Sequence, residues 1–100
     1  MLLKLGVSIE RLKRPIRRSL TVIDNIFKKY DGIEAVITST YEGTHMPSSL
    51  HYDDNAIDLR KSPVNSMNIV EALKKALGIS YQIVLESDHI HLEYDPKGKE

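Results

Sequence analysis

The feature that most limits how this chain can fold is the alternation of polar and apolar residues in the segment DHIHLE, residues 88–93. Successive side chains of a β-strand point to opposite faces, so His89, His91 and Glu93 would share one face. The apolar residues between them would share the other face, which is expected to enter the core. The pattern therefore predicts a half-buried strand whose histidine face is turned toward something polar.

An amphipathic helix is predicted at about residues 15–30. Pro15 suits a first helical turn because it lacks the amide hydrogen that would be unpaired there. Apolar residues then recur at helical spacing from Ile16 to Tyr30. Gly32 is expected to end the helix in the left-handed conformation.

A second helix and three further strands complete the predicted elements. The helix would begin at Ser62-Pro63, where a hydroxyl cap precedes proline, and would stop at Gly78. A loop rich in Ser, Thr, Gly and Pro is expected over residues 39–50. The three further strands are predicted at residues 33–38, 56–60 and 81–86.

This order of elements predicts an α+β fold in which two helices pack on one side of a small, mostly antiparallel sheet. A chain of 100 residues that is 41% hydrophobic is expected to form one domain, residues 1–100. Its core would span about residues 15–94, and both ends would be flexible. The sequence does not indicate an oligomeric state.

Charge and composition exclude several classes of protein. The formal net charge is zero, so no nucleic-acid partner is expected. No apolar run approaches the length of a membrane span or of a signal peptide, which predicts synthesis in the cytoplasm. The basic run Arg11–Arg18 fits either a solvated helix face or an anion-binding surface. Because cysteine is absent, any bound metal must use histidine, carboxylate and water.

A histidine and an aspartate elsewhere in the chain match the histidine face of the last strand. Asp58 lies between apolar neighbours in AIDLR and shares its strand face with the small Ala56, while His51 lies seven positions earlier at the end of the loop. Together with His91 they form a mixed histidine and carboxylate set that leaves an open position, as a catalytic zinc requires. Asp88 or Glu86 would take the proton. Solvated histidines and a turn aspartate remain the alternative.

The stretch SSLHYDDNAIDLR followed by DHIHLE resembles the paired motifs of the D-alanyl-D-alanine carboxypeptidase-like zinc peptidases, a superfamily that includes the hedgehog amino-terminal domain. The first motif corresponds to Ser49, His51, Ala56 and Asp58. The second corresponds to Asp88, His89 and His91. The strand that leads into the first motif is similar to VITS, and the resemblance covers about residues 36–93.

The resemblance implies a hedgehog/DD-peptidase-like fold with one zinc ion, and a peptidase that hydrolyses stem peptides or cross-bridges of peptidoglycan. The implied zinc ligands are His51, Asp58 and His91. Asp88 would be the general base and later the acid, His89 would stabilise the tetrahedral oxyanion, and Ser49 would contact the substrate. A small phage-type lytic enzyme fits this implication, acting at the cell wall after release or delivery, or in a virion.

Two positions depart from the family pattern. The glycine three residues after the first histidine is Asp54 here, a residue that tolerates left-handed backbone. The substrate-clamping arginine expected after VITS is missing, since the region reads Thr40-Tyr41-Glu42; His45 or Lys61 would have to replace it. This second departure keeps open an alternative, a zinc-binding interaction or virion-structural module without activity. A metal-free structural protein is the other alternative.

Overall fold

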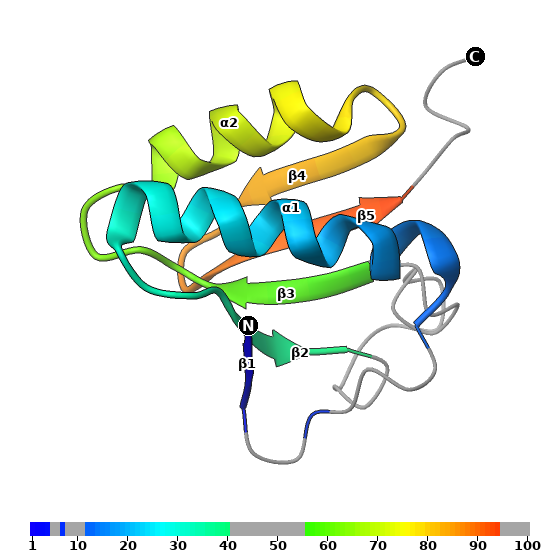
Figure 1. The fold of residues 1–100 in the computed structure, drawn as a ribbon, viewed down its shortest axis with the longest axis horizontal. Coiled ribbons are helices and arrows are strands. Elements are labelled where there is room, and N and C mark those ends of the chain that lie inside the picture. Colours follow the sequence, from blue (N-terminus) through cyan, green and yellow to red (C-terminus); the bar gives the residue numbers. More distant parts are fainter. Residues whose placement is uncertain (5–6, 8–11, 41–55, 95–100) are drawn as a thin grey trace.

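The computed structural model describes residues 1–4, 7, 12–40 and 56–94. Within these ranges the chain forms a five-stranded mixed sheet and two helices, an α+β arrangement (Figure 1). The elements, in chain order, are β1 (Leu2–Leu3), α1 (Arg14–Asp31), β2 (Val36–Ser39), β3 (Ala56–Arg60), α2 (Ser66–Leu77), β4 (Tyr81–Leu85) and β5 (His89–Tyr94).

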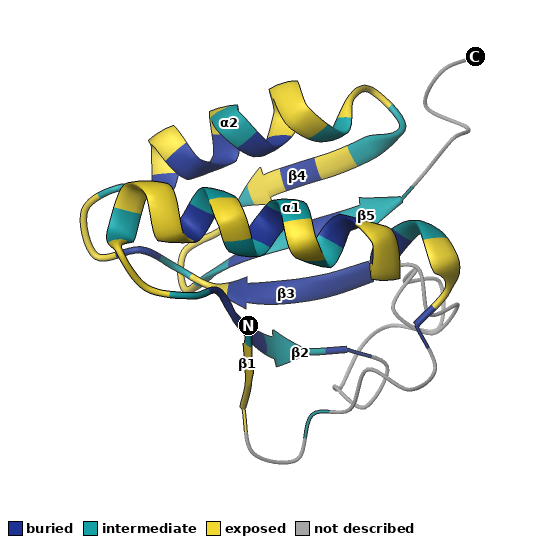
Figure 2. Cartoon of the chain, viewed as in Figure 1, coloured by how far each residue is buried: buried dark blue, intermediate teal, exposed yellow. Residues whose placement is uncertain are grey.

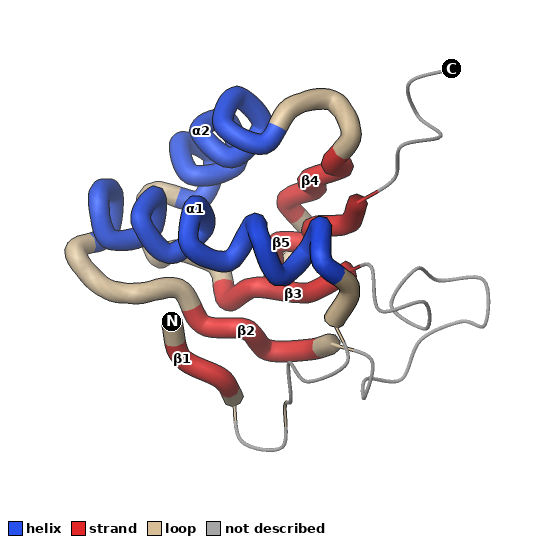
Figure 3. The backbone as a smooth tube through the Cα atoms, turned by 45° about the vertical axis from the view of Figure 1, so that its right-hand side comes forward, coloured by secondary structure: helices blue, strands red, loops and turns tan. Residues whose placement is uncertain are grey.

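The strand order in the sheet is β1-β2-β3-β5-β4. β1 runs parallel to β2, and the other neighbouring strands are antiparallel. Both helices lie on the same side of the sheet, as the two views in Figures 1 and 3 show. The opposite face of β3 and β5 is therefore left for polar side chains.

One hydrophobic cluster joins the helices to the sheet (Figure 2). α1 contributes the stripe that its periodicity predicts, including Ile16, Ile23 and Phe27. The strands contribute the apolar half of their alternation, and its fully buried members are Ile37, Ile57, Leu59, Ile90 and Leu92. Because one face of each central strand is committed to this core, the register of the sheet determines which polar residues meet on the other face.

The predicted helix end is confirmed at Gly32. Its φ of 74° lies in the left-handed region, and its N–H donates to the Lys28 carbonyl at 2.9 Å. A side chain at this position would strain the backbone, so glycine satisfies the last turn of α1 at low cost.

The N-terminal residues add a strand that was not predicted. β1 pairs with β2 through the Leu2 N–H, which donates to the Ala35 carbonyl at 2.8 Å, while the side chains of Leu2 and Leu3 are exposed. Two residues are too few to show a period, so the pattern carries no signal for this strand. The prediction for residues 33–38 also begins too early, because Ile33 is 62% exposed and β2 starts at Val36.

The start of α2 is later than predicted. Ser62 caps a turn that precedes the helix: its Oγ accepts the Asn65 N–H at 2.8 Å and donates to Asp31 Oδ1 at 2.7 Å. Asn65 Nδ2 adds a bond to the Tyr30 carbonyl at 2.9 Å. These bonds tie the end of α1 to the start of α2, and the regular helix begins only at Ser66.

No helix in the part of the chain that the structure describes is long and apolar enough to cross a membrane.

We expect Ser62→Ala to lower the free energy of unfolding by about 0.5–2 kcal/mol, because the partly buried Asn65 N–H and Asp31 carboxylate lose a shared partner. Urea unfolding followed by circular dichroism measures this change. Ser87→Ala, at an exposed serine, is the matched control and should stay within about 0.5 kcal/mol of the unmodified protein. Equal stability of the two variants would contradict the role assigned to Ser62.

Candidate functional site

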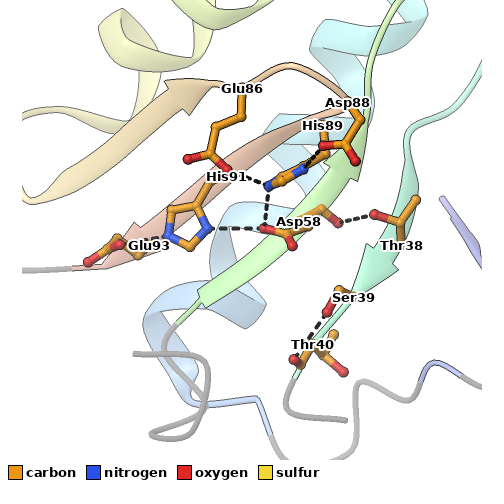
Figure 4. Close-up of polar contacts among 9 residues, drawn as sticks. All are labelled: Thr38, Ser39, Thr40, Asp58, Glu86, Asp88, His89, His91 and Glu93. Atoms are coloured by element: carbon orange, nitrogen blue, oxygen red, sulfur yellow. Dashed lines mark hydrogen bonds and ion pairs between the residues drawn. The ribbon is translucent and has the colours of Figure 1, made fainter. Parts of the chain in front are cut away.

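Asp58 and His91 meet on the sheet face that points away from the helices (Figure 4). They are directly opposite each other in the antiparallel pair of β3 and β5, and directly opposite side chains share a face. His91 Nδ1 lies 3.0 Å from Asp58 Oδ1. The alternation that sends Ile57 and Leu59 into the core is what turns Asp58 toward the histidine.

Glu93 contacts the other side of the same imidazole. Its Oε1 lies 2.6 Å from His91 Nε2, two residues further along β5 and on the same face. The side chains of Asp58, His91 and Glu93 are 10%, 19% and 17% exposed, so all three are largely removed from water. His91 is thus held between two carboxylates in a partly desolvated place.

These contacts raise the pKa of His91 above its ordinary value of 6.5. The hydrogen bond to Asp58 is the largest cause. Burial opposes it, and the contact with Glu93 reinforces it. The positive charge of the protonated ring is favoured because it compensates two carboxylates in a place that water screens poorly.

His89 has a different pair of partners. Its Nε2 lies 2.6 Å from Glu86 Oε1, and its Nδ1 lies 2.6 Å from Asp88 Oδ1. Its Nε2 is also 3.6 Å from Asp58 Oδ1, which places it beside the Asp58–His91 pair (Figure 4). Glu86 lies in the three-residue link between β4 and β5, residues 86–88, and its N–H donates to the His89 carbonyl at 2.9 Å.

Asp88 lies in that link, and its side chain is 83% exposed. It contacts His89 and was expected to lean over the position between the metal ligands. Glu86, the other candidate for the proton acceptor, also contacts His89. Both carboxylates are therefore separated from the Asp58–His91 pair by the ring of His89.

The backbone next to Asp58 is irregular. Ile37 of β2 pairs with Leu59, but Ser39 pairs with Asp58, so the register shifts between Ile37 and Ser39. The Thr38 hydroxyl donates to the Asp58 carbonyl at 3.4 Å at this point. Such irregularities are common next to functional sites because they redirect side chains.

Two basic side chains, Lys61 and Arg60, lie near the end of β3. Lys61, which the sequence offers as a substitute for the missing arginine, donates to the Ser87 carbonyl at 3.1 Å. Arg60 lies opposite His89 in the register of β3 and β5, and its side chain is exposed. His45, Ser49, His51 and Asp54 lie outside the described residues.

The contact between Asp58 and His91 fits one edge of a metal coordination sphere. Two ligands bound at about 2.0–2.1 Å in tetrahedral geometry are about 3.3 Å apart. The 3.0 Å between His91 Nδ1 and Asp58 Oδ1 is close to this edge. Within the described ranges, no group of three or more His, Cys, Asp and Glu side chains is arranged to hold a metal ion. Two of the three predicted ligands, Asp58 and His91, are thus in contact. The third, His51, lies outside the described ranges.

Sequence reasoning placed Glu93 on the histidine face but left its partner open, and it did not pair Glu86 with His89. Alternation along β5 was the available signal for Glu93. The Glu86 contact depends on the three-residue link between β4 and β5, whose length fixes the register.

No family model, curated protein or solved structure matches this chain.

We expect the metal-free protein to show a His91 pKa above 6.5, and Asp58→Asn to lower it, because the main stabiliser of the protonated ring is removed. NMR titration in the presence of a chelator measures both values. Because the pKa of His91 is higher in the folded chain, protonation of His91 stabilises the fold. This stabilisation is complete below the pKa of the unfolded chain and is lost as the pH rises through the folded-state pKa.

The variant His91→Gln should therefore lose more unfolding free energy, relative to the unmodified protein, near about pH 6 than near about pH 8. A deficit that grows with pH would contradict this assignment.

Proposed function

We propose that this protein is a zinc metallopeptidase of the hedgehog/DD-peptidase type that hydrolyses peptide bonds in peptidoglycan stem peptides or cross-bridges. The observation that carries the proposal is the contact of Asp58 with His91 across β3 and β5, at the two positions where the paired motifs require ligands. The resemblance of SSLHYDDNAIDLR and DHIHLE to those motifs supplies the reaction and the substrate class.

The residues that would hold the zinc ion are His51, Asp58 and His91. When bound, zinc would supply Lewis acidity at the scissile carbonyl and lower the pKa of the attacking water. The chain supplies a partly desolvated place in which two carboxylates already favour a positive charge on His91.

Asp88 would accept a proton from the attacking water and return it to the leaving amine. Its place in the link between β4 and β5 leaves the carboxylate accessible to a substrate that lies over the sheet face. His89 would donate a hydrogen bond to the developing oxyanion, for which one of its ring N–H groups must leave Glu86 or Asp88. Ser49 would bind the substrate, and the place of action would be the cell wall or a virion that delivers the enzyme there.

A second candidate is a zinc-binding interaction or virion-structural module of the same fold. The position of Asp88 favours it: the carboxylate is 83% exposed and contacts His89, while the Asp58–His91 pair lies beyond that ring. A general base must come within hydrogen-bond reach of the proton that it removes. Activity therefore requires Asp88 to move toward the pair when substrate binds.

We expect the purified chain to bind one zinc ion, and zinc at about 100 times its dissociation constant to stabilise the fold by about 2.7 kcal/mol. Asp58→Ala and His91→Ala should abolish this stabilisation, whereas His89→Ala should retain it. Metal analysis and thermal unfolding with and without chelator measure the effect. A melting temperature that zinc and chelator leave unchanged would show a metal-free protein.

We expect purified peptidoglycan to be cleaved by the zinc-loaded chain, with new amino groups released. Asp88→Asn should reduce turnover by about 100-fold or more while zinc remains bound, and Glu86→Gln should reduce it much less. Mass spectrometry of the released fragments identifies the bond. Zinc-loaded protein that is as inactive as Asp88→Asn would support the binding module in place of the enzyme.

A further inference from the structure

We propose that Glu93 is the positioning residue for His91: it holds the Nε2–H so that Nδ1, on the Asp58 side of the ring, is the nitrogen that binds the cation. The inference rests on the metal site of the proposed function and gives a role to a residue to which neither motif assigns one.

The geometry makes the two ring nitrogens distinct. Nδ1 faces Asp58 Oδ1 at 3.0 Å, and Nε2 faces Glu93 Oε1 at 2.6 Å. A carboxylate is an acceptor only, and a neutral imidazole carries one N–H, so the neutral ring can donate to only one of the two carboxylates, and the other needs a second proton or a cation opposite it. A cation at Asp58 replaces the proton on Nδ1, and the remaining proton stays on Nε2 against Glu93.

Glu93 is built to hold this orientation. Its side chain is 17% exposed, and its place in β5 is fixed by pairing with Ala56 on one side and Gln82 on the other. A carboxylate that accepts the second N–H of a ligating histidine fixes the ring and increases its basicity. Loss of such a partner typically weakens metal binding by about 10- to 100-fold.

His89 lies on the same face, but its carboxylate partners are more exposed than those of His91 and it lies further from Asp58. Both of its nitrogens contact carboxylates from the β4–β5 region, Glu86 and Asp88, whose side chains are 47% and 83% exposed. Its nearer nitrogen is 3.6 Å from Asp58 Oδ1, further than the Nδ1 of His91. Glu86 thus makes the same kind of contact to an imidazole that is not a proposed ligand, which gives a matched control.

The test measures zinc affinity by competition with a chromophoric chelator for the full chain and its variants. Glu93→Ala should weaken zinc binding by about 10- to 100-fold, and Glu93→Gln, which keeps an acceptor but loses the charge, by a smaller factor. Glu86→Gln should change the affinity by less than about threefold, since its carboxylate contacts His89, which is not a proposed ligand. Melting temperatures in chelator check that each variant folds; if Glu93→Ala does not, the isosteric Glu93→Gln carries the comparison.

Nitrogen-15 NMR of the zinc-loaded protein gives an independent readout. We expect the His91 shifts to identify Nδ1 as the metal-bound nitrogen and Nε2 as the protonated one. Normal zinc affinity in both Glu93 variants, or binding through Nε2, would overturn the role of Glu93 and leave the metal site standing. Absence of zinc binding by the unmodified chain would overturn both.

Discussion

The pairing of Asp58 with His91 across β3 and β5 is the interaction on which the site depends. It exists because the apolar neighbours of each residue enter the core beneath α1 and α2, which leaves the polar residues together on the other face. A shift of one residue in this register would send Asp58 into the core and separate it from His91. Core packing and site geometry are therefore set by the same hydrogen-bonded ladder.

Electrostatics gives this face its preference for positive charge. Two imidazoles contact four carboxylates, and the carboxylates are Asp58, Glu86, Asp88 and Glu93. Around His91 the carboxylates are largely shielded from water, so an uncompensated negative charge there is costly. In the metal-free protein the contacts with Asp58 and Glu93 favour the protonated form of His91, which raises its pKa despite burial. A divalent cation would meet the same demand.

Much of the fold follows from periodicity, because long amphipathic elements carry a strong signal. The helix that ends at Gly32 and the strand AIDLR are confirmed, and the last two strands agree to within one residue at each end. The two-residue β1 has no period to detect, and the turn capped by Ser62 delays α2 because its hydroxyl also binds Asp31 at the end of α1. In the site, alternation places His89, His91 and Glu93 on one face. The partner of each imidazole depends on cross-strand register and on the link at residues 86–88, which no local pattern specifies.

The central claim is that a cation binds at Asp58 and His91, and X-ray absorption spectroscopy of the protein loaded with one equivalent of zinc tests it most directly. We expect a nitrogen and oxygen shell at about 2.0–2.1 Å with the multiple-scattering signature of two imidazoles. Zinc that the protein does not retain, or a shell of oxygen ligands without imidazole scattering, would contradict it.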